Sequence, residues 1–322
     1  MIHVTAAIIT HNNKILSVRR GADKHLAGYW EFPGGKLEQG ETLEACLKRE
    51  LEEELGINAC IGDYVGQSTH DYGKQLIRLN AFMVPVASIE MTLTDHDKSK
   101  WLSHDELDDV EWAPADIPIV HQLKTYLFYR NNAEAYIAET LPIVMSDSLN
   151  HFIVCLPNNA KLLDVGCGSG RDTLFFKQQG YDVVATDMVS EMAASAAKQL
   201  SQEVLVRSCF NLGFKNEFDG VWASASLLHC PKTEFVSALS HIAQALMTGG
   251  VVYLSLKQGI GESLDNRGRY FSYYAQDEIK TLVKQVTDLS IIKLWLDESV
   301  IVESRLHNNS QMWINLLLRK GS

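Results

Sequence analysis

The sequence predicts an α/β protein of two domains, and three observations lead to this prediction. The 322 residues are enough for two hydrophobic cores, and 46% of them are apolar against 21% charged, as in globular proteins. A glutamate-rich stretch within 35–57 has a helical pattern and follows a glycine turn. A glycine loop within 161–172 opens a separate strand-helix-strand pattern. These two patterns belong to different units, so the chain divides between them.

The junction between the two patterns is expected to be helical. Residues 117–144 contain little glycine, serine or proline and have the periodicity of a packed helix, unlike a flexible linker. We place the boundary near residue 128, which gives domains of residues 1–127 and 128–322.

Composition excludes several classes of function. The net charge of -11 argues against binding to duplex nucleic acid, which requires a basic surface. The six cysteines form no C-x-x-C pair, so we expect a reduced, cytoplasmic protein. We find no signal peptide and no apolar run long enough to span a membrane, and we therefore expect no membrane partner.

The first elements are a strand, a turn and a strand within residues 1–16, followed by the glutamate-rich helix. In "RELEEELG" (49–56), the periodicity of an α-helix places Glu50, Glu53 and Glu54 on one side of the helix, and Glu52 points away from them. A solvated helix face is the simple interpretation. A bound divalent cation is the alternative, because it would offset the repulsion of three carboxylates and prefers oxygen ligands.

The wider window "GKLEQGETLEACLKRELEEELGI" (35–57) favours the metal site, because it resembles the Nudix box at every fixed position. Together with "GYWEFPGGKLEQGE" and "WAPADIPIV", it is similar to the MutT and CTP pyrophosphohydrolase branch of the Nudix hydrolases, over residues 1–127. The resemblance implies an α/β/α sandwich. It also implies hydrolysis of a nucleoside diphosphate linked to another group, with Mg²⁺ or Mn²⁺ as cofactor.

The resemblance also implies roles for individual residues. The implied catalytic residues are Arg49, Glu50 and Glu53, and the implied metal ligands are Gly35, Glu50, Glu53, Glu54 and Asp95. Arg49 would orient Glu53 by an ion pair. Asp95 stands where relatives commonly have a glutamate, and a surface-loop charge is its alternative interpretation.

A free nucleoside triphosphate is the expected substrate, because the extra motifs of enzymes for NADH, ADP-ribose or coenzyme A are absent from the sequence. Arg20 and Asp116 are the implied nucleotide-binding residues, and the position of Asp116 contacts the base edge in MutT-like relatives. A cap of the following helix is an equally good interpretation of Asp116.

The second half begins with "KLLDVGCGSGRD" (161–172), and "YDVVATDMVSEMAASAAKQL" places a second strand that ends at Asp187. Further strands are expected within 217–229 and 251–259, a helix with a glycine stop over 233–250, and a closing antiparallel pair at 291–298 and 311–320. The glycines are spaced G-x-G-x-G, whereas a dinucleotide fingerprint needs G-x-G-x-x-G.

This half resembles the class I S-adenosylmethionine-dependent methyltransferases, which implies a Rossmann-like domain over residues 128–322. The implied cofactor is S-adenosylmethionine, and the implied cofactor-binding residues are Asp164, Gly166, Gly168, Gly170 and Asp187. Asp187 would accept hydrogen bonds from the ribose hydroxyls.

The methyl acceptor is not identified by the sequence. His229 could act as a base, although a lone histidine after an apolar strand is more often a packing residue. Arg269 and Tyr270 lie in "NRGRYFSYY" (266–274), a predicted loop that would close over an anionic or aromatic acceptor, or serve as a structural loop.

We therefore expect a bifunctional enzyme with a small-molecule nucleotide substrate and an unknown methyl acceptor. The alternative is a Nudix hydrolase regulated by a non-catalytic domain that senses S-adenosylmethionine.

Overall fold

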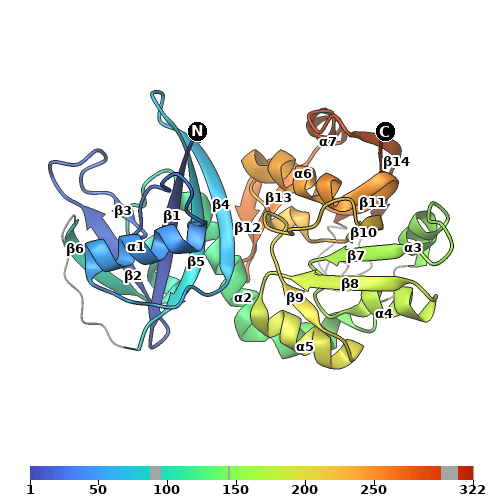
Figure 1. Cartoon of the computed structure of the whole chain (residues 1–322), viewed down its shortest axis with the longest axis horizontal. Helices are drawn as coiled ribbons and strands as arrows, with labels where there is room; N and C mark the ends of the chain where they lie inside the picture. The colour runs from blue at the N-terminus through green and yellow to red at the C-terminus, as the bar shows by residue number, and fades with distance from the viewer. Residues whose placement is uncertain (88–95, 144–145, 299–310, 322) are drawn as a thin grey trace. The chain divides into compact units, whose positions relative to one another are not determined.

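The chain forms two compact units, Met1–Lys124 and Thr125–Ser322 (Figure 1). The computed structural model describes residues 1–87, 96–143, 146–298 and 311–321. The division between the units falls inside helix α2 (Ile117–Thr140), which is kinked at Asn132. The helical junction is therefore confirmed, whereas the boundary near residue 128 stays a prediction.

A mixed sheet forms the N-terminal unit. Its strands are β1 (Ile2–His11), β2 (Lys14–Arg20), β3 (Trp30–Glu31), β4 (Tyr64–Asp71), β5 (Leu76–Pro85) and β6 (His96–Leu102). They run in the order β3-β2-β1-β5-β4, and β6 also pairs with β2. β1 and β5 are parallel, and the other pairs are antiparallel. The short helix η1 (His104–Asp108) follows β6.

Helix α1 (Leu43–Leu55) lies across one face of this sheet (Figure 1). Its buried residues are Cys46, Leu47, Leu51 and Leu55. This apolar stripe recurs every three or four residues and packs the helix against the sheet. Thr42 caps the helix by accepting a hydrogen bond from Ala45 N, and Gly56 ends it in the left-handed region at φ 68°. The opposite side of α1 is left free to carry the glutamates.

A second, largely parallel sheet forms the C-terminal unit. Its strands are β7 (Lys161–Val165), β8 (Asp182–Asp187), β9 (Val204–Val206), β10 (Phe218–Ala223), β11 (Leu246–Gln258), β12 (Glu262–Leu264), β13 (Tyr270–Tyr274), β14 (Leu289–Glu298) and β15 (Met312–Lys320). The order is β12-β13-β11-β10-β7-β8-β9, and β15 lies antiparallel between β11 and β14. The expected closing antiparallel pair is therefore confirmed.

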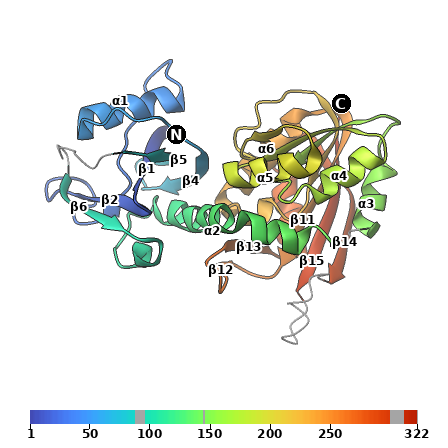
Figure 2. The ribbon, with the colours of Figure 1, turned by 90° about the horizontal axis from the view of Figure 1, so that it is seen from below.

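Helices cover this sheet and complete its α/β pattern. They are α3 (Ser146–Ile153), α4 (Arg171–Gln178), α5 (Ser190–Leu200), α6 (Phe235–Ala245), α7 (Gln276–Val283) and the short η2 (Leu227–His229) and η3 (Lys232–Glu234). Helices α4 and α5 connect parallel strands and lie side by side (Figure 2). In the core, the rings of Trp222 and Tyr253 stack at 3.9 Å. Every helix in the described ranges is too short or too polar to span a bilayer.

Two local expectations for this unit are wrong. Helix α6 ends at Ala245, and the glycines expected to stop it lie inside β11. Residues 270–274, predicted as part of a loop, form strand β13. Their aromatic side chains favour a strand, and Tyr270, Phe271 and Tyr274 are buried there.

Candidate active sites

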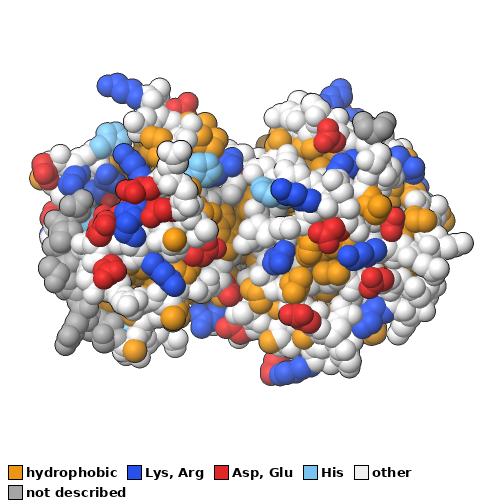
Figure 3. Space-filling view, viewed as in Figure 1, with side chains coloured by type: hydrophobic (Ala, Val, Ile, Leu, Met, Phe, Trp, Pro, Cys, Tyr) orange, Lys and Arg blue, Asp and Glu red, His pale blue; other side chains and the backbone are white. Residues whose placement is uncertain are grey.

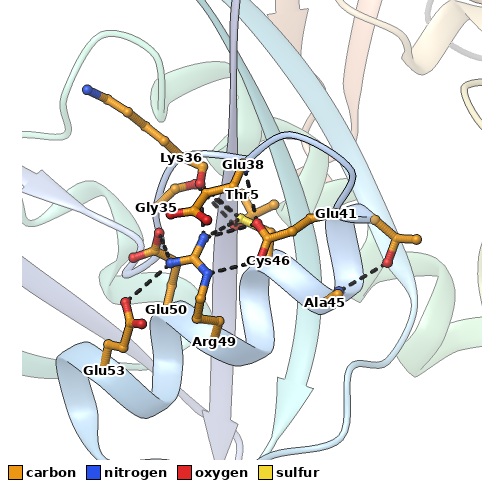
Figure 4. A network of polar contacts seen from close by, with 11 residues as sticks. Thr5, Gly35, Lys36, Glu38, Glu41, Ala45, Cys46, Arg49, Glu50 and Glu53 are labelled. Carbon is orange, nitrogen blue, oxygen red and sulfur yellow. Dashed lines mark hydrogen bonds and ion pairs between the residues drawn. The ribbon is translucent and has the colours of Figure 1, made fainter.

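Arg49 on α1 is the centre of a polar network in the N-terminal unit (Figure 4). Its guanidinium donates to both carboxylate oxygens of Glu41, at 2.9 and 3.1 Å, to Glu50 at 2.9 Å and to Glu53 at 3.2 Å. The hydrogen bonds from Arg49 lower the pKa of Glu41 to about 2, and Glu41 and Glu50 raise the pKa of Arg49. One arginine thus holds three carboxylates in position. The ion pair expected between Arg49 and Glu53 is present.

Glu50 lies directly against the glycine turn that precedes α1. A β-carbon on Gly35 would be only 2.0 Å from Glu50 Cδ, so a larger residue would displace this carboxylate. The Gly35 carbonyl accepts hydrogen bonds from the backbone N–H and the hydroxyl of Thr5, at 2.8 and 3.3 Å. The turn is therefore attached to β1, and it leaves a space that the Glu50 side chain fills.

The predicted metal ligands differ in their surroundings. The Glu53 side chain is 59% exposed, Glu54 lines a cavity, and Asp95 lies outside the described residues. Acidic and basic side chains lie side by side over the face that carries α1 (Figure 3). In the ranges that the structure describes, no three acidic, histidine or cysteine side chains are grouped so as to hold a metal ion. The donor atoms are all oxygens, which suits Mg²⁺ or Mn²⁺, so the residues fit the ion by their chemistry.

A cavity of about 250 Å³ lies beside these groups. Glu54 and both predicted nucleotide-binding residues, Arg20 and Asp116, line it. Glu31 also lines the cavity, where it accepts hydrogen bonds from Arg20 Nη1 and, at 3.0 Å, from His96 Nε2. The volume is slightly below the range of about 300–1,000 Å³ that is usual for ligand pockets.

Asp116 is 5% exposed, and its Oδ1 accepts a hydrogen bond of 3.0 Å from Phe32 N. Burial, with the nearby charge of Glu31, raises the pKa of Asp116 well above its usual range. Helix α2 begins at the next residue, but the carboxyl group binds Phe32 and not a helix N–H group. The capping interpretation of this side chain is therefore wrong.

In the C-terminal unit, the predicted cofactor loop joins β7 to α4. Gly166, Gly168 and Gly170 have φ values of 73°, 56° and 75°, in the left-handed region that favours glycine. A β-carbon on Gly166 would lie 2.6 Å from Ser226 Cβ. The Ser226 hydroxyl is buried without a hydrogen-bond partner in the described part of the chain. A turn with this conformation and an unsatisfied hydroxyl fit a polar ligand such as S-adenosylmethionine.

The two predicted carboxylates of this site have different environments. Asp187 ends β8 and accepts hydrogen bonds from Gly168 N and Val189 N, both at 3.0 Å. Asp164 is 2% exposed and accepts from the Thr173 hydroxyl at 2.6 Å. Burial, with the neighbouring Asp172, raises the pKa of Asp164 to about 7. Asp187 thus holds the glycine loop directly, whereas Asp164 is part of the buried strand beneath it.

His229 connects two elements through both ring nitrogens. Its Nδ1 donates to the Tyr270 carbonyl at 2.6 Å, and its Nε2 lies 2.9 Å from the Tyr129 hydroxyl on α2. Burial lowers the pKa of His229 to about 3. These contacts favour a positioning role for His229, because its basic nitrogen already accepts from Tyr129.

Two cations lie near this histidine. Arg269 forms a two-point ion pair with Asp265, at 2.9 and 2.8 Å. Lys257 Nζ lies 3.4 Å from the centroid of the Phe271 ring and has no ion-pair partner in the described residues. Burial, with the charge of Arg269, lowers the pKa of Lys257 to about 8. Lys257 is therefore a partly buried cation that packs on the Phe271 ring, near the second cation Arg269.

Six residues of these sites have no sequence prediction: Glu31, Glu41, His96, Tyr129, Ser226 and Lys257. Glu41 has a clear signal, because it is the glutamate that follows Gly35 in the box after five residues. The other five reach their sites only through contacts between segments far apart in the chain, as where β2 pairs with both β3 and β6 and where Tyr129 of α2 contacts His229. No local spacing marks them.

Residues 1–125 match the family model described as the NUDIX domain. The CTP pyrophosphohydrolase of Escherichia coli (strain K12) is 42% identical over 120 residues, which cover 37% of this chain and 89% of the relative. The chain belongs to the Nudix family. An 8-oxo-dGTP diphosphatase of Proteus vulgaris is 40% identical to the Nudix unit over 93 residues, or 28% of this chain and 82% of the relative.

Residues 162–250 match the family model described as a methyltransferase domain. The structure of the 1,6-didemethyltoxoflavin-N1-methyltransferase of Burkholderia thailandensis has a TM-score of 0.50 and 20% identity, and the match covers 65% of this chain and 93% of that one. At this identity the likeness concerns the fold. The predicted fusion of a Nudix hydrolase with a Rossmann-like methyltransferase domain is confirmed.

Proposed function

We propose that the Nudix unit hydrolyses a nucleoside triphosphate with water to a monophosphate and pyrophosphate. The arrangement of Glu50 and Glu53 around Arg49, next to a cavity lined by Arg20, Glu54 and Asp116, carries this proposal. The names of the relatives, a CTP pyrophosphohydrolase and an 8-oxo-dGTP diphosphatase, support a triphosphate substrate.

Within this proposal each residue has a role. Glu53, Glu54 and the Gly35 carbonyl bind Mg²⁺ or Mn²⁺, and Glu50 is a further ligand or orients the attacking water. The ion, when bound, neutralises charge on the phosphate oxygens. Arg49 positions Glu50 and Glu53, while Arg20 and Asp116 bind the nucleotide.

The second proposed activity is S-adenosylmethionine-dependent methyl transfer. The left-handed glycine turn, Asp187 and the unsatisfied Ser226 hydroxyl support binding of the donor. The methyl-acceptor side of the site would be formed by His229, Arg269 and Tyr270. Tyr129 would belong to it through its contact with His229, and Lys257 through its contact with the Phe271 ring. The mixture of aromatic rings and cations favours an anionic or aromatic acceptor.

A pyrophosphate-release screen tests the first activity. Normal and oxidised nucleoside triphosphates are incubated with Mg²⁺ or Mn²⁺, with and without S-adenosylmethionine, and donor binding is measured separately by calorimetry. We expect metal-dependent release of one pyrophosphate per monophosphate and saturable donor binding. Absence of turnover on every triphosphate would refute the hydrolase proposal, and absence of donor binding would refute the second.

A further inference from the structure

Lys257 lies at the edge of the C-terminal sheet that also carries the predicted cofactor groups. It is the second-last residue of β11, and β11 runs parallel to β10 and β13. The glycine loop follows the parallel strand β7, and Asp187 ends β8, so both lie at the same carboxyl edge of the sheet. Open α/β sheets bind their ligands at this edge. The position of Lys257 therefore favours a role in ligand binding.

The charges around the Phe271 ring are not balanced. Lys257 Nζ lies 3.4 Å from the centroid of this ring, and Arg269 Cζ lies 5.2 Å from the same centroid. Asp265 is occupied by other donors: its Oδ2 accepts from the Arg269 guanidinium, and its Oδ1 accepts from the backbone N–H groups of Arg267 and Arg269. The charges that act on Lys257 within the described residues are Arg269 and Asp265, so two cations share one carboxylate.

Partial burial makes this excess positive charge costly. Burial first, and then the charge of Arg269, lowers the pKa of Lys257 to about 8. A bound anion would pair with Lys257 and offset the repulsion from Arg269, and such a partly buried pair is screened little by salt. A titratable group that is perturbed by burial and by a specific charge, at the ligand edge of a sheet, is typical of a binding site.

Aromatic rings form a continuous series from this cation to the glycine loop. The His229 ring lies 4.7 Å from the Phe271 ring and 5.5 Å from the Tyr129 ring, measured between centroids. The Tyr129 ring lies 5.0 Å from that of Tyr136, and a β-carbon on Gly168 would be 3.9 Å from Tyr136 Cε1. These rings offer apolar contacts to a flat ligand beside the donor loop.

We propose that the methyl acceptor is a planar aromatic compound with an anionic group, which Lys257 binds while the neighbouring rings bind the body of the molecule. Arg269 stays paired with Asp265 and acts on the site through its charge. A neutral compound of the same shape leaves the Lys257 cation unpaired and therefore binds less tightly. This inference rests on the proposed methyl transfer and names the acceptor class of that site.

The test measures the binding of matched compounds to the full chain by calorimetry at pH 7. Each pair is a carboxylate and the amide of the same shape: benzoate and benzamide, salicylate and salicylamide, and 2-naphthoate and 2-naphthamide. Binding is measured with and without saturating S-adenosylhomocysteine. We expect the carboxylate of at least one pair to bind about tenfold or more tightly than its amide, because an ion pair is lost with the amide.

Lys257→Met should weaken binding of that carboxylate by about tenfold and change binding of the amide by less than a factor of about two, because methionine keeps the contact with Phe271 without the charge. Lys257→Arg keeps the charge and should retain a preference for the carboxylate. Lys280→Met, at a partly exposed position on α7, is the matched control and should keep the wild-type preference.

Equal affinity for carboxylate and amide in every pair, or no binding of any carboxylate, would overturn the inference. An equal loss for both compounds in folded Lys257→Met would do the same. If the variants do not fold, the carboxylate-to-amide ratio of the wild type decides the matter. If S-adenosylmethionine does not bind, the proposed methyl transfer fails, whereas a carboxylate preference that Lys257→Met removes would still support an anion site at Lys257.

Discussion

Glu53 is the residue at which the network around Arg49 can be altered with least damage to the fold. Its side chain is 59% exposed and touches Arg49 by one bond of 3.2 Å. Glu53→Gln keeps the size and one oxygen but removes the charge that a metal ion requires. We expect hydrolysis to fall by roughly a hundredfold or more, with unchanged melting temperature and unchanged S-adenosylmethionine binding. Pyrophosphate release and thermal unfolding measure both effects.

Glu52→Gln is the control for this prediction. Glu52 is exposed and belongs to the same helix, but it takes no part in the Arg49 network. The same loss of charge should leave turnover within a factor of about two. Wild-type turnover in Glu53→Gln, or an equal loss in Glu52→Gln, would contradict the metal-ligand assignment.

Lys257 is a residue whose charge opposes stability. Its pKa in the folded chain is about 8, below the ordinary 10.5, because burial and Arg269 disfavour the cation. Between about pH 8 and 10.5 the unfolded chain therefore binds more protons than the folded chain. The contribution of Lys257 to the free energy of unfolding becomes more favourable only as the pH rises through that window. Below pH 8 the full penalty remains, and contact with the Phe271 ring offsets part of it.

Lys257→Met should accordingly raise the free energy of unfolding by about 1–2 kcal/mol at pH 7, because the methionine keeps the packing and removes the charge. The gain should shrink as the pH approaches 10. Thermal unfolding at pH 7, 8.5 and 10 measures this change. Lys280→Met, at a partly exposed position on α7, should give no such trend. A lower melting temperature for Lys257→Met at pH 7 would show that the ring contacts outweigh the burial.

At the scale of elements, the cap of α1 controls the geometry of the hydrolase site. Thr42 Oγ1 accepts from Ala45 N at 3.2 Å, and the helix that it starts carries Arg49, Glu50 and Glu53. Thr42→Ala should cost about 1 kcal/mol of stability, whereas Thr42→Ser keeps the hydroxyl and should cost little. Chemical denaturation of the three proteins checks this ranking. Equal stability of the alanine and serine variants would exclude a capping role.

Those elements that have strong local signals could be predicted from the sequence. Helix α1 combines a cap, an apolar stripe and a closing glycine. The loop after β7 requires positive φ angles, which glycine adopts readily, at Gly166, Gly168 and Gly170. These requirements act within a few residues, so they can be read from the chain itself. The helix and the glycine loop follow from these local signals, whereas their assignment to a Nudix box and to a cofactor loop rests on the resemblance to known families.

Features that depend on tertiary packing could not be predicted. Helix α6 ends before Gly249 because β11 begins at Leu246 and pairs with Phe218 of β10. Tyr270 belongs to a strand because β13 pairs with β11 and β12. His96 reaches Glu31 only because β6 and β3 both pair with β2. In each case a distant segment decides the outcome, and local propensity is overridden.

At the scale of the whole molecule, each proposed activity uses residues of its own unit. The hydrolase groups lie before residue 125, and the cofactor groups lie after it. Asp187→Ala should therefore act on one activity alone. It removes the acceptor for Gly168 N and the proposed acceptor for the ribose hydroxyls, so binding of S-adenosylmethionine should weaken by about 1.5–3 kcal/mol. Asp182→Ala, at the exposed start of the same strand, is the calorimetric control.

The same variant separates a bifunctional enzyme from a hydrolase regulated by its second domain. Two uncoupled sites leave each other's ligand affinity unchanged. A regulatory site must instead change the affinity of the hydrolase site for its substrate, by a coupling free energy that is typically about 1–3 kcal/mol. For the bifunctional enzyme, we expect kcat/KM for the triphosphate to be the same with and without saturating S-adenosylmethionine. A regulated hydrolase would show a change of roughly five- to 150-fold. This change should disappear in Asp187→Ala at a donor concentration that saturates the wild type but lies well below the weakened Kd of the variant, and it should persist in Asp182→Ala. Only a bound donor can transmit a regulatory effect. If S-adenosylmethionine still changed kcat/KM in Asp187→Ala at a concentration at which calorimetry detects no bound donor, regulation through this site would be excluded.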